Sequence, residues 1–439
     1  MKKSELSQNY RAFAQSNLSP TQGERDLVSQ LFEAVKRALG LNIFMAGSYA
    51  RYTSIRPMHD IDIIFIAGKY NPSNLNPSTI LSQLKIEIER RFQNPTEYMF
   101  TVLLQSHSIS INFKKNEEEV FSIDIVPAFE AGEINEFGTS IYYVPEILKV
   151  GHRRRQMQYE EFNKIKTNEK EWWIKSDPRG YISAASILNQ NNSDFRKTVK
   201  LLKRWKYNCK NELDNFKLKS FHIEQIVYNI FFKNQQFDVS DAIFTFFVEL
   251  IHQIDKPKIT DRADKSTFID AYISSLTSDE KEIIIQLRDG FLIKLEEIKD
   301  TVDINDLLKP MRRTRKSSTE SYLFDLNIPT YTTSDNTLNI SAKVLQRDGG
   351  FREEYLGPNG KINVDRNIEF KLREPKNSQD IYKWKVKNDD NSPDPRGEIT
   401  DHQTRNNPEN TKYRGNHHVE CYQIRDGICI ARAKQPVVL

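Results

Sequence analysis

Cysteine is scarce in this sequence. Its 439 residues include three cysteines, Cys209, Cys421 and Cys429, which are too few and too scattered for a disulfide framework. None of them forms a CxxC pair, so the spacing also argues against a structural zinc site. This usage predicts a reducing compartment, and therefore a cytoplasmic protein.

Long apolar runs are missing as well. No stretch approaches the ~20 apolar residues that a membrane-spanning helix needs. The first residues, MKKSELSQNY, carry two lysines, but no apolar segment follows them, which argues against a signal peptide. We therefore expect a soluble protein without a membrane partner.

The sequence also lacks a large excess of either charge. Its 64 basic and 60 acidic residues give a formal net charge of +4, which excludes a histone-like or polyanionic protein. Nucleotide binding stays open, because a near-neutral total can hide a local basic patch. With 38% hydrophobic residues, a chain of this length can bury a core without disulfides, and it suggests two or three domains.

The sequence pattern changes along the chain. The first part alternates helical spacing with short apolar runs that are typical of strands, and two such runs, 101–113 and 120–126, flank a polar turn. Broad apolar helix faces follow, then the basic, weakly periodic MRRTRKSSTES, then short alternating runs such as HVECYQI. The predicted division is 1–155, mixed α and β; 156–305, helical; 306–325, a linker; and 326–439, a small β-rich domain.

Three aspartates in apolar strands carry the strongest chemical signal. Asp60 and Asp62 stand two residues apart in HDIDIIFI, so their side chains share one face of a strand. Asp124 lies in a second apolar strand, FSIDIVPAF. Carboxylates held this close repel one another unless a cation lies between them, and oxygen ligands of this kind suit Mg²⁺. We predict that these three residues are catalytic and bind metal.

Gly47 and Ser48 follow a predicted strand and precede a polar turn. Glycine lets the backbone approach a phosphate closely, and the backbone amides and the serine hydroxyl can donate hydrogen bonds to it. A lone Gly-Ser pair or a lone DxD is most often structural, but the ordered combination is specific. We therefore predict that Gly47 and Ser48 bind nucleotide.

This ordered pattern resembles the nucleotidyltransferases of the DNA polymerase β superfamily. It is more closely similar to the CD-NTases, bacterial relatives of cyclic GMP–AMP synthase and oligoadenylate synthetase, over residues 20–300. The resemblance implies an α+β fold: a polymerase β-like palm with a mixed sheet at 1–155, a helical domain at 156–305, an active site between them, and a small β-rich C-terminal domain.

In the predicted helical domain, the same resemblance implies candidate residues for binding the donor nucleoside triphosphate. In RKTVKLLKRWK and LKSFHIE, the residues that match the family's helix lysine, helix-start serine and base-stacking aromatic are Lys203, Ser220 and Phe221. An ammonium group and a hydroxyl at a helix start suit a polyphosphate, and stacking tolerates any base. Structural alternatives remain open: a solvated helix face for the lysine, an N-cap for the serine, and core packing for the aromatic.

Several further residues are weaker candidates. Arg51, Arg56 and His59 lie in the loop before Asp60, where they could contact the triphosphate or the acceptor nucleotide, or carry solvated charge. The basic run GHRRRQMQY at 151–159 could face the cleft or solvent. For the adjacent Trp172 and Trp173, filling an interdomain gap is favoured over binding a base.

The last part of the chain resembles the C-terminal sensor domain that accompanies bacterial second-messenger synthetases. The resemblance is strongest from Tyr382 onward and implies a nucleotide or another activating ligand. The basic and aromatic candidates to bind phosphate or a base are Trp384, Lys385, Lys387, Arg396, Arg414 and Arg432. His417 and His418 are adjacent on a strand and so should point to opposite faces, which favours a structural role over a metal site.

These features predict an enzyme that joins nucleoside triphosphates into a cyclic or short linear oligonucleotide messenger. By resemblance, the substrates are ATP, with GTP or other NTPs as alternatives, the cofactor is a pair of Mg²⁺ ions or alternatively Mn²⁺, and a separate effector protein reads the product in bacterial antiphage defence of the CBASS type. A transferase acting on RNA or protein and a catalytically silent nucleotide sensor are the competing hypotheses. The base choice, the linkage, the ring size, the activating signal and the oligomeric state stay open.

Overall fold

The computed structural model describes residues 1–439 except 71–75, 149–170, 346–353, 374–376 and 402–407. The chain forms two compact units, one made of Tyr10–Ile284 and the other of Met1–Asn9 together with Ile285–Leu439. We call the first the catalytic unit, after the predicted catalytic aspartates that it contains, and the second the C-terminal unit. Among the helices of the described residues, none is both long enough and apolar enough to cross a membrane. The basic run at 151–159 lies outside the described residues.

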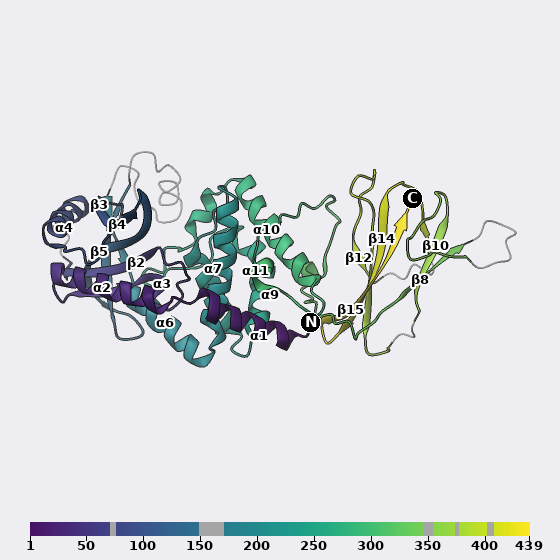
Figure 1. The fold of residues 1–439 in the computed structure, drawn as a ribbon, viewed down its shortest axis with the longest axis horizontal. Coiled ribbons are helices and arrows are strands. Elements are labelled where there is room, and N and C mark those ends of the chain that lie inside the picture. The colour runs from purple at the N-terminus through teal and green to yellow at the C-terminus, as the bar shows by residue number, and fades with distance from the viewer. Residues whose placement is uncertain (71–75, 149–170, 346–353, 374–376, 402–407) are drawn as a thin grey trace. The chain divides into compact units, whose positions relative to one another are not determined.

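A single sheet organises the first part of the catalytic unit (Figure 1). Its strands are β1 (Ile43–Ala46), β2 (Asp60–Lys69), β3 (Met99–Leu104), β4 (Ile109–Lys115), β5 (Glu118–Ile134), β6 (Ser140–Ile147) and β7 (Glu171–Ser176). Five of them run in the order β1-β2-β5-β4-β3, and β6 pairs with both β5 and β7. The sheet is mixed, since β2 and β5 are parallel and the other pairs are antiparallel. The apolar strand that carries the predicted aspartates is therefore central.

The same unit contains most of the helices. They are α1 (Lys3–Phe13), which begins in the C-terminal unit, α2 (Gln22–Leu39), α3 (Gly47–Ala50), α4 (Pro77–Arg91), α6 (Pro178–Asn191), α7 (Asp194–Glu212), α8 (Ser220–Lys233), α9 (Val239–Gln253) and the start of α10 (Ser278–Glu296), with a π-helical turn at Ala14–Leu18 and a 3₁₀ turn at Ala271–Ser275. Helix α2 begins at a capping box, in which Thr21 and Glu24 exchange side-chain and backbone hydrogen bonds.

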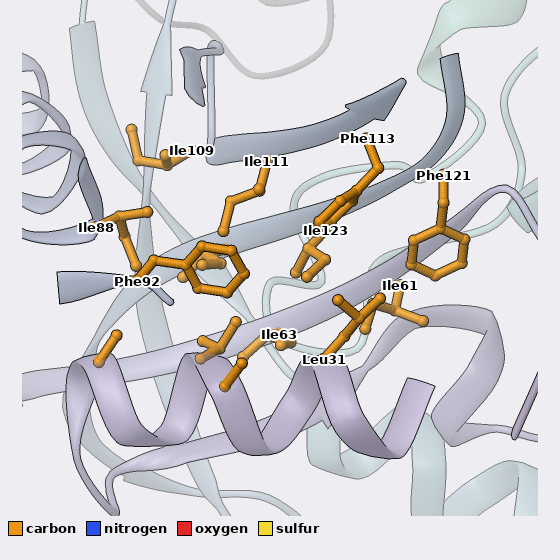
Figure 2. Packing of buried hydrophobic residues seen from close by; sticks show 14 of the residues in the cluster. Leu31, Ile61, Ile63, Ile88, Phe92, Ile109, Ile111, Phe113, Phe121 and Ile123 are labelled. Carbon is orange, nitrogen blue, oxygen red and sulfur yellow. The ribbon is translucent and has the colours of Figure 1, made fainter. Parts of the chain in front are cut away.

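The two faces of the central strand have different roles. Ile61 and Ile63 of β2 point into a core that α2 and α4 close, with Leu31 and Ile88 among its members (Figure 2). Successive strand residues face opposite sides, so the aspartates of this strand lie on the other face. That face packs a smaller cluster around Ala46, Ile64, Ala128, Tyr142 and Val144.

Helices α7, α8 and α9 pack together in the second half of the catalytic unit. Trp205 of α7 is buried, and its ring meets Phe216 and Phe247 edge-on at centroid distances of 5.6 and 4.8 Å. This packing fixes the orientation of α7 about its own axis, and therefore fixes which of its lysines are buried. Trp173 is on β7, where it packs against Phe129 and Tyr70 at centroid distances of 5.3 and 6.0 Å.

The C-terminal unit is built on two antiparallel sheets of four strands each. One has the order β13-β10-β8-β9 and the other the order β12-β11-β14-β15. The strands are β8 (Ile340–Leu345), β9 (Glu354–Tyr355), β10 (Asn367–Leu372), β11 (Ile381–Lys387), β12 (Ile399–Thr400), β13 (Glu409–Asn410), β14 (Asn416–Arg425) and β15 (Ile428–Val438). A core around Ile368, Phe370, Trp384, Val419 and Cys421 joins residues of both sheets.

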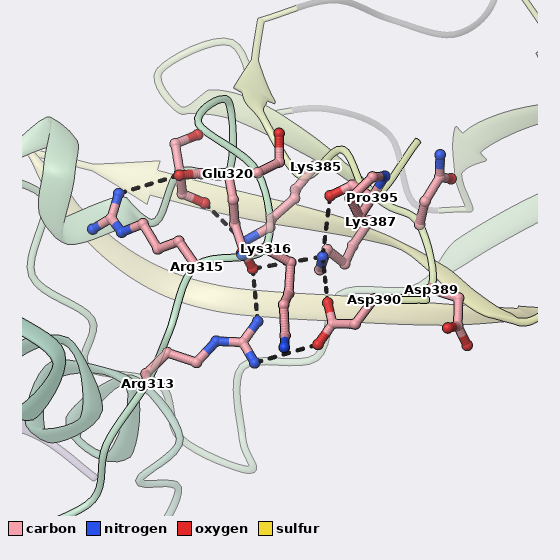
Figure 3. A network of polar contacts seen from close by, with 12 residues as sticks. Arg313, Arg315, Lys316, Glu320, Lys385, Lys387, Asp389, Asp390 and Pro395 are labelled. Atoms are coloured by element: carbon pink, nitrogen blue, oxygen red, sulfur yellow. Dashed lines mark hydrogen bonds and ion pairs between the residues drawn. The ribbon is translucent and has the colours of Figure 1, made fainter. Parts of the chain in front are cut away.

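The basic segment before these sheets has no regular secondary structure, but ion pairs hold it against neighbouring residues. Between α11 (Ile304–Leu307) and the 3₁₀ turn Leu323–Leu326, residues 308–322 form no helix or strand. Arg313 donates to Glu320 at 2.8 Å, and Arg315 pairs with Asp289 at 2.8 Å. Figure 3 shows these arginines within a network of acidic and basic side chains around Glu320. The segment expected to be a linker is thus held in place by ion pairs.

The predicted fold class is confirmed. The chain is α+β, with a mixed sheet and helices in the catalytic unit and antiparallel β-sheets at its C-terminal end. The predicted run 120–126 lies within β5. The run expected as 101–113 is divided into β3 and β4, because a turn around Ser106 interrupts it.

Candidate active site

Strands β2 and β5 bring the predicted aspartates together. The two strands run parallel, with Asp62 directly opposite Asp124 and Asp60 opposite Ser122. Asp60 is exposed at the start of its strand, whereas Asp62 and Asp124 are partly buried. Residues that lie opposite each other on neighbouring strands have side chains on the same face. The sheet register therefore places both partly buried carboxylates on the face away from the α2–α4 core.

The carboxylates of Asp62 and Asp124 repel each other. Burial, followed by the charges of Asp60 and Asp124, raises the pKa of Asp62 to about 6. Burial also raises the pKa of Asp124. A hydrogen bond from Ser110 lowers this pKa, and the charge of Asp60 raises it further. One oxygen of Asp124, Oδ1, is buried without a hydrogen-bond partner. A cation placed here would remove the repulsion and give this oxygen a partner.

The carboxylates do not by themselves form a closed metal cage. Across the part of the chain that the structure describes, no group of three or more His, Cys, Asp or Glu side chains is arranged to hold a metal ion. The residues nevertheless fit Mg²⁺, which takes one or two protein carboxylates and completes its shell with water and substrate phosphates. Asp62 and Asp124 supply such a pair.

Gly47 lies against Asp62. Its φ is +63°, and a Cβ atom added to it would fall 1.6 Å from Oδ2 of Asp62. No side chain can occupy that position unless the carboxylate moves. The glycine that the sequence suggested for phosphate contact therefore has a second role, which is to leave room for Asp62.

If the aspartates are catalytic as predicted, replacing Gly47 by alanine should lower the rate of the predicted nucleotidyl transfer by roughly 100-fold, because displacing a reactive group by about 1 Å can cost that much. Gly40 offers a matched control, since its φ is also positive, at +90°, but an added Cβ would meet nothing within 4 Å. Thermal unfolding and product formation should be measured for both variants. Equal activity of Gly47→Ala and Gly40→Ala would contradict this role.

A cavity of 410 Å³ is lined by Asp60, the first of the three aspartates. Its walls bring together side chains that are far apart in the sequence: Ser48 and Asp60 from the sheet region, and Ser220, Lys203, Lys206 and Lys210 from α7 and α8. Loop 54–59, Tyr207 and Asn211 complete the lining. The cavity thus has an acidic end at Asp60 and a wall of lysines, an arrangement that suits a metal–polyphosphate complex.

Lys203 is buried in a charge network instead of projecting into solvent. It is 6% exposed, and its Nζ donates to Glu224 Oε2 at 2.9 Å and to Thr53 O and Oγ1 at 3.1 Å each. Glu224 is 1% exposed and also accepts from Arg51 Nε at 2.5 Å. This network ties α7 and α8 to the loop that follows Ser48.

The two neighbouring donor-site candidates differ in their surroundings. Ser220 is the first residue of α8 and lines the cavity. Phe221 is partly buried: its ring meets Tyr181 edge-on at 5.0 Å, and the Arg51 guanidinium lies 5.1 Å from its centroid. Ser220 thus faces the space predicted for the triphosphate, whereas Phe221 lies against protein side chains.

The loop candidates have structural contacts of their own. Arg51 forms its ion pair with Glu224, and Arg56 donates to the carbonyl oxygens of Ser16 and Asn17. His59 is exposed and lies parallel to the ring of Tyr207, at 6.0 Å between centroids. Arg56 and His59 line the cavity. Roles for these residues in nucleotide binding stay predictions.

Sequence reasoning missed Glu224, Lys206 and Lys210. The spacing in KLLKRWKYNCK already placed Lys203, Lys206 and Lys210 near one face of a helix, so the two further lysines could have been found. Glu224 gave no comparable signal, because its partners lie 21 residues away in Lys203 and 173 away in Arg51.

Comparison with known families agrees with this geometry. Residues 5–147 match the Second Messenger Oligonucleotide or Dinucleotide Synthetase domain, abbreviated SMODS. Residues 313–439 match the Adenylyl/Guanylyl and SMODS C-terminal sensor domain. The chain therefore contains a segment of the SMODS family and a segment of the C-terminal sensor family. The resemblance predicted from the motifs is confirmed, and the SMODS domain is a nucleotidyltransferase of the oligonucleotide- or dinucleotide-synthesising type.

Solved structures with detectable similarity have low sequence identity. CdnC of E. coli MS115-1 with ATP is 15% identical at a TM-score of 0.46, over 65% of this chain and 92% of that one. CdnE of Elizabethkingia meningoseptica, a cyclic dinucleotide synthase with GTP and Apcpp, is 15% identical at 0.42, over 61% and 96%. CdnG of Bradyrhizobium diazoefficiens with GTP is 11% identical at 0.45, over 66% and 93%. No curated protein matches the sequence.

The segment that matches the sensor domain uses most of its basic candidates in internal contacts. Lys385 donates to Ser321 O at 2.7 Å, Lys387 pairs with Asp390 at 2.7 Å, and Arg432 pairs with Glu420 at 2.6 Å. Arg396 pairs with Glu409, and Arg414 is exposed. Trp384 is buried in the core between the sheets.

A cavity of 270 Å³ lies in the sensor domain. Ile368, Phe370 and Val419 supply apolar lining, and Arg396 and His417 are among its polar residues. Nε2 of His417 lies 2.8 Å from Tyr413 O, while His418 lies 3.4 Å from Glu420. The adjacent histidines thus have different neighbours, in keeping with the opposite strand faces predicted for them.

Proposed function

We propose that this protein is a Mg²⁺-dependent nucleotidyltransferase that joins nucleoside triphosphates into a cyclic or short linear oligonucleotide messenger and releases pyrophosphate. The observation that carries the proposal is the facing pair Asp62 and Asp124, together with a lysine-walled cavity that is lined by Asp60 of the same strand as Asp62. We further propose the residue division 1–155, 156–305, 306–325 and 326–439 for palm, helical domain, linker and sensor.

The proposed reaction is a displacement at the α-phosphorus. A ribose hydroxyl oxygen of the acceptor forms the new P–O bond, the bond from the α-phosphorus to the bridging oxygen breaks, and the hydroxyl proton passes to Asp124 or to water. Asp60, Asp62 and Asp124 would hold the divalent ions. When bound, Mg²⁺ supplies positive charge for the attacking and leaving oxygens. Gly47, Ser48 and Ser220 would position the phosphates.

We propose ATP as the first substrate to test, with GTP as the alternative, and Mn²⁺ as a substitute ion. The similar CdnC and CdnG structures contain ATP and GTP respectively. A role in bacterial antiphage defence, with a separate effector reading the product, is part of the proposal, as is a nucleotide or activating ligand for the sensor domain. The cavity lined by Arg396 and His417 is the candidate place for that ligand.

Product analysis tests the proposed function. The protein is incubated with mixed NTPs and Mg²⁺, with and without phage-infected lysate, and the products are identified by mass spectrometry. An Asp60→Ala, Asp62→Ala double variant serves as the control. A small oligonucleotide that requires the aspartates supports the proposal. Label transferred to RNA or protein, or no product from a folded protein under either condition, overturns it.

Metal binding should weaken at low pH. Since the raised pKa of Asp62, about 6, means that it holds a proton below that pH, the proton competes with Mg²⁺ there. We expect the affinity for Mg²⁺ to be nearly constant above pH 7 and to fall by roughly tenfold per pH unit below 6. Calorimetric titration at pH 5, 6, 7 and 8 measures this. A constant affinity across the range would contradict the assignment of Asp62 as a ligand.

A further inference from the structure

Helix α7 presents three lysines to the cavity that Asp60 lines. Lys203, Lys206 and Lys210 recur at helical spacing and line the same space as Ser48 and Ser220. Their environments are not equivalent. The resemblance to the CD-NTases assigned the triphosphate contact to the first of them, Lys203.

All three N–H donors of the Lys203 ammonium group are used in hydrogen bonds. A lysine side chain has three N–H donors and no acceptor. The three contacts of Lys203, to Glu224 Oε2 and to the two oxygens of Thr53, account for all three. A phosphate oxygen could accept a hydrogen bond from Lys203 only by displacing Glu224 from a buried ion pair or Thr53 from a buried hydrogen bond, and either loss is costly.

Lys206 differs from Lys203 in its contacts. It is half-buried, and within the described residues it has neither a hydrogen bond nor an ion pair. Burial lowers its pKa first, and the charges of Lys210 and Lys203 lower it further, while Asp60 opposes them. A half-buried cation among like charges is unfavourable in the empty cavity, so an anion would be drawn to it.

We propose that Lys206, supported by Lys210, is the lysine that binds the β- and γ-phosphates of the donor nucleoside triphosphate, and that Lys203 is a positioning residue. This assignment rests on the proposed function, since it names the polyphosphate ligands of that same cavity. Lys203 holds the loop after Ser48 in place, and Lys206 provides the free ammonium that meets the substrate.

Binding of inorganic tripolyphosphate separates the two roles without depending on the base. Calorimetry in Mg²⁺ should show that Lys206→Met weakens tripolyphosphate binding by roughly 10–100-fold, the range expected for one charge-assisted contact. Lys206→Arg should restore most of it, and binding of inorganic monophosphate should change little. Lys197→Met removes a charge from the same helix outside the cavity, and should leave binding near that of the wild type.

Thermal unfolding completes the test. Lys206→Met should unfold at or above the wild-type temperature, whereas Lys203→Met should unfold at a lower one. Wild-type affinity for tripolyphosphate in Lys206→Met, or an equal loss in Lys197→Met, overturns the assignment. If the wild type binds tripolyphosphate through Lys206 but yields no oligonucleotide, the proposed function fails while the phosphate site stands. If the wild type makes oligonucleotide but Lys206→Met binds normally, only the phosphate site fails.

Discussion

Asp62→Asn should reduce product formation by roughly a thousand-fold, while making the metal-free protein more stable at neutral pH. The loss of activity follows because an amide cannot supply the charge that holds a divalent ion, whose contribution to transfer is several kcal/mol. The gain in stability follows because ionised Asp62 is partly buried beside Asp60 and Asp124, and the folded state therefore raises its pKa to about 6. A rise of about two pKa units corresponds to about 1–3 kcal/mol.

The gain in stability of Asp62→Asn depends on pH. Below the unfolded pKa of about 4, Asp62 is protonated in both states and costs nothing. As pH rises toward 6, the unfolded chain releases the proton and the folded one retains it, so stability falls. The stabilising effect of Asp62→Asn should therefore grow from pH 4 to pH 6 and then level off. Thermal unfolding in EDTA across this range measures it.

A matched control separates this effect from a general change of charge. Asp26 lies on the exposed side of helix α2 and accepts a hydrogen bond from Gln22 at 2.7 Å. Asp26→Asn should therefore leave product formation unchanged and change the free energy of unfolding by no more than about 0.5 kcal/mol. An active Asp62→Asn protein, or an inactive one that is also less stable than the wild type above pH 6, would refute the interpretation of Asp62 as a repelled metal ligand.

The aspartate pair could be predicted because it depends on local periodicity. A strand alternates its faces every residue, so Asp60 and Asp62 had to share a face wherever the strand lay. The apolar residues on both sides of them predicted a central strand, and β2 lies between β1 and β5. Placing Asp124 next to Asp62 also needed the family resemblance, because register between distant strands is set by tertiary packing.

The burial of charges could not be predicted from the sequence. In KLLKRWKYNCK the lysines share one local pattern, yet Lys203 is buried and Lys210 is exposed. What separates them is the packing of α7 around Trp205 and the position of Glu224 on another helix. The basic MRRTRKSSTES shows the same limit, because two of its arginines, Arg315 and Arg313, are paired with Asp289 and Glu320 respectively. Ion pairs between distant segments follow no periodic pattern in the sequence, so the sequence does not reveal them.

The buried network gives the second large prediction. Glu224→Ala should destabilise the catalytic unit by about 3–5 kcal/mol, because Lys203 and Arg51 would be left as buried charges without a counter-charge. Burial disfavours ionised Glu224, but Arg51 and Lys203 outweigh it and lower its pKa to about 2. The stability that Glu224 provides is therefore present above pH 4.5 and is lost as pH falls toward 2. Urea unfolding at pH 7 measures the loss.

Companion variants distinguish the ion pair from mere packing. Glu224→Gln keeps the shape and an acceptor for Thr53 Oγ1, which donates at 2.9 Å, but it removes the charge, so it should fall between the wild type and Glu224→Ala. Adding Lys203→Met to Glu224→Ala removes one stranded charge and should recover part of the lost stability, because an apolar side chain costs less there than an unpaired ammonium. If the double variant is less stable than Glu224→Ala by the full cost of Lys203→Met alone, the two side chains do not interact. That result would also remove the reason for regarding the Lys203 ammonium as held by Glu224, and with it the case for Lys206 as the lysine that meets the phosphates.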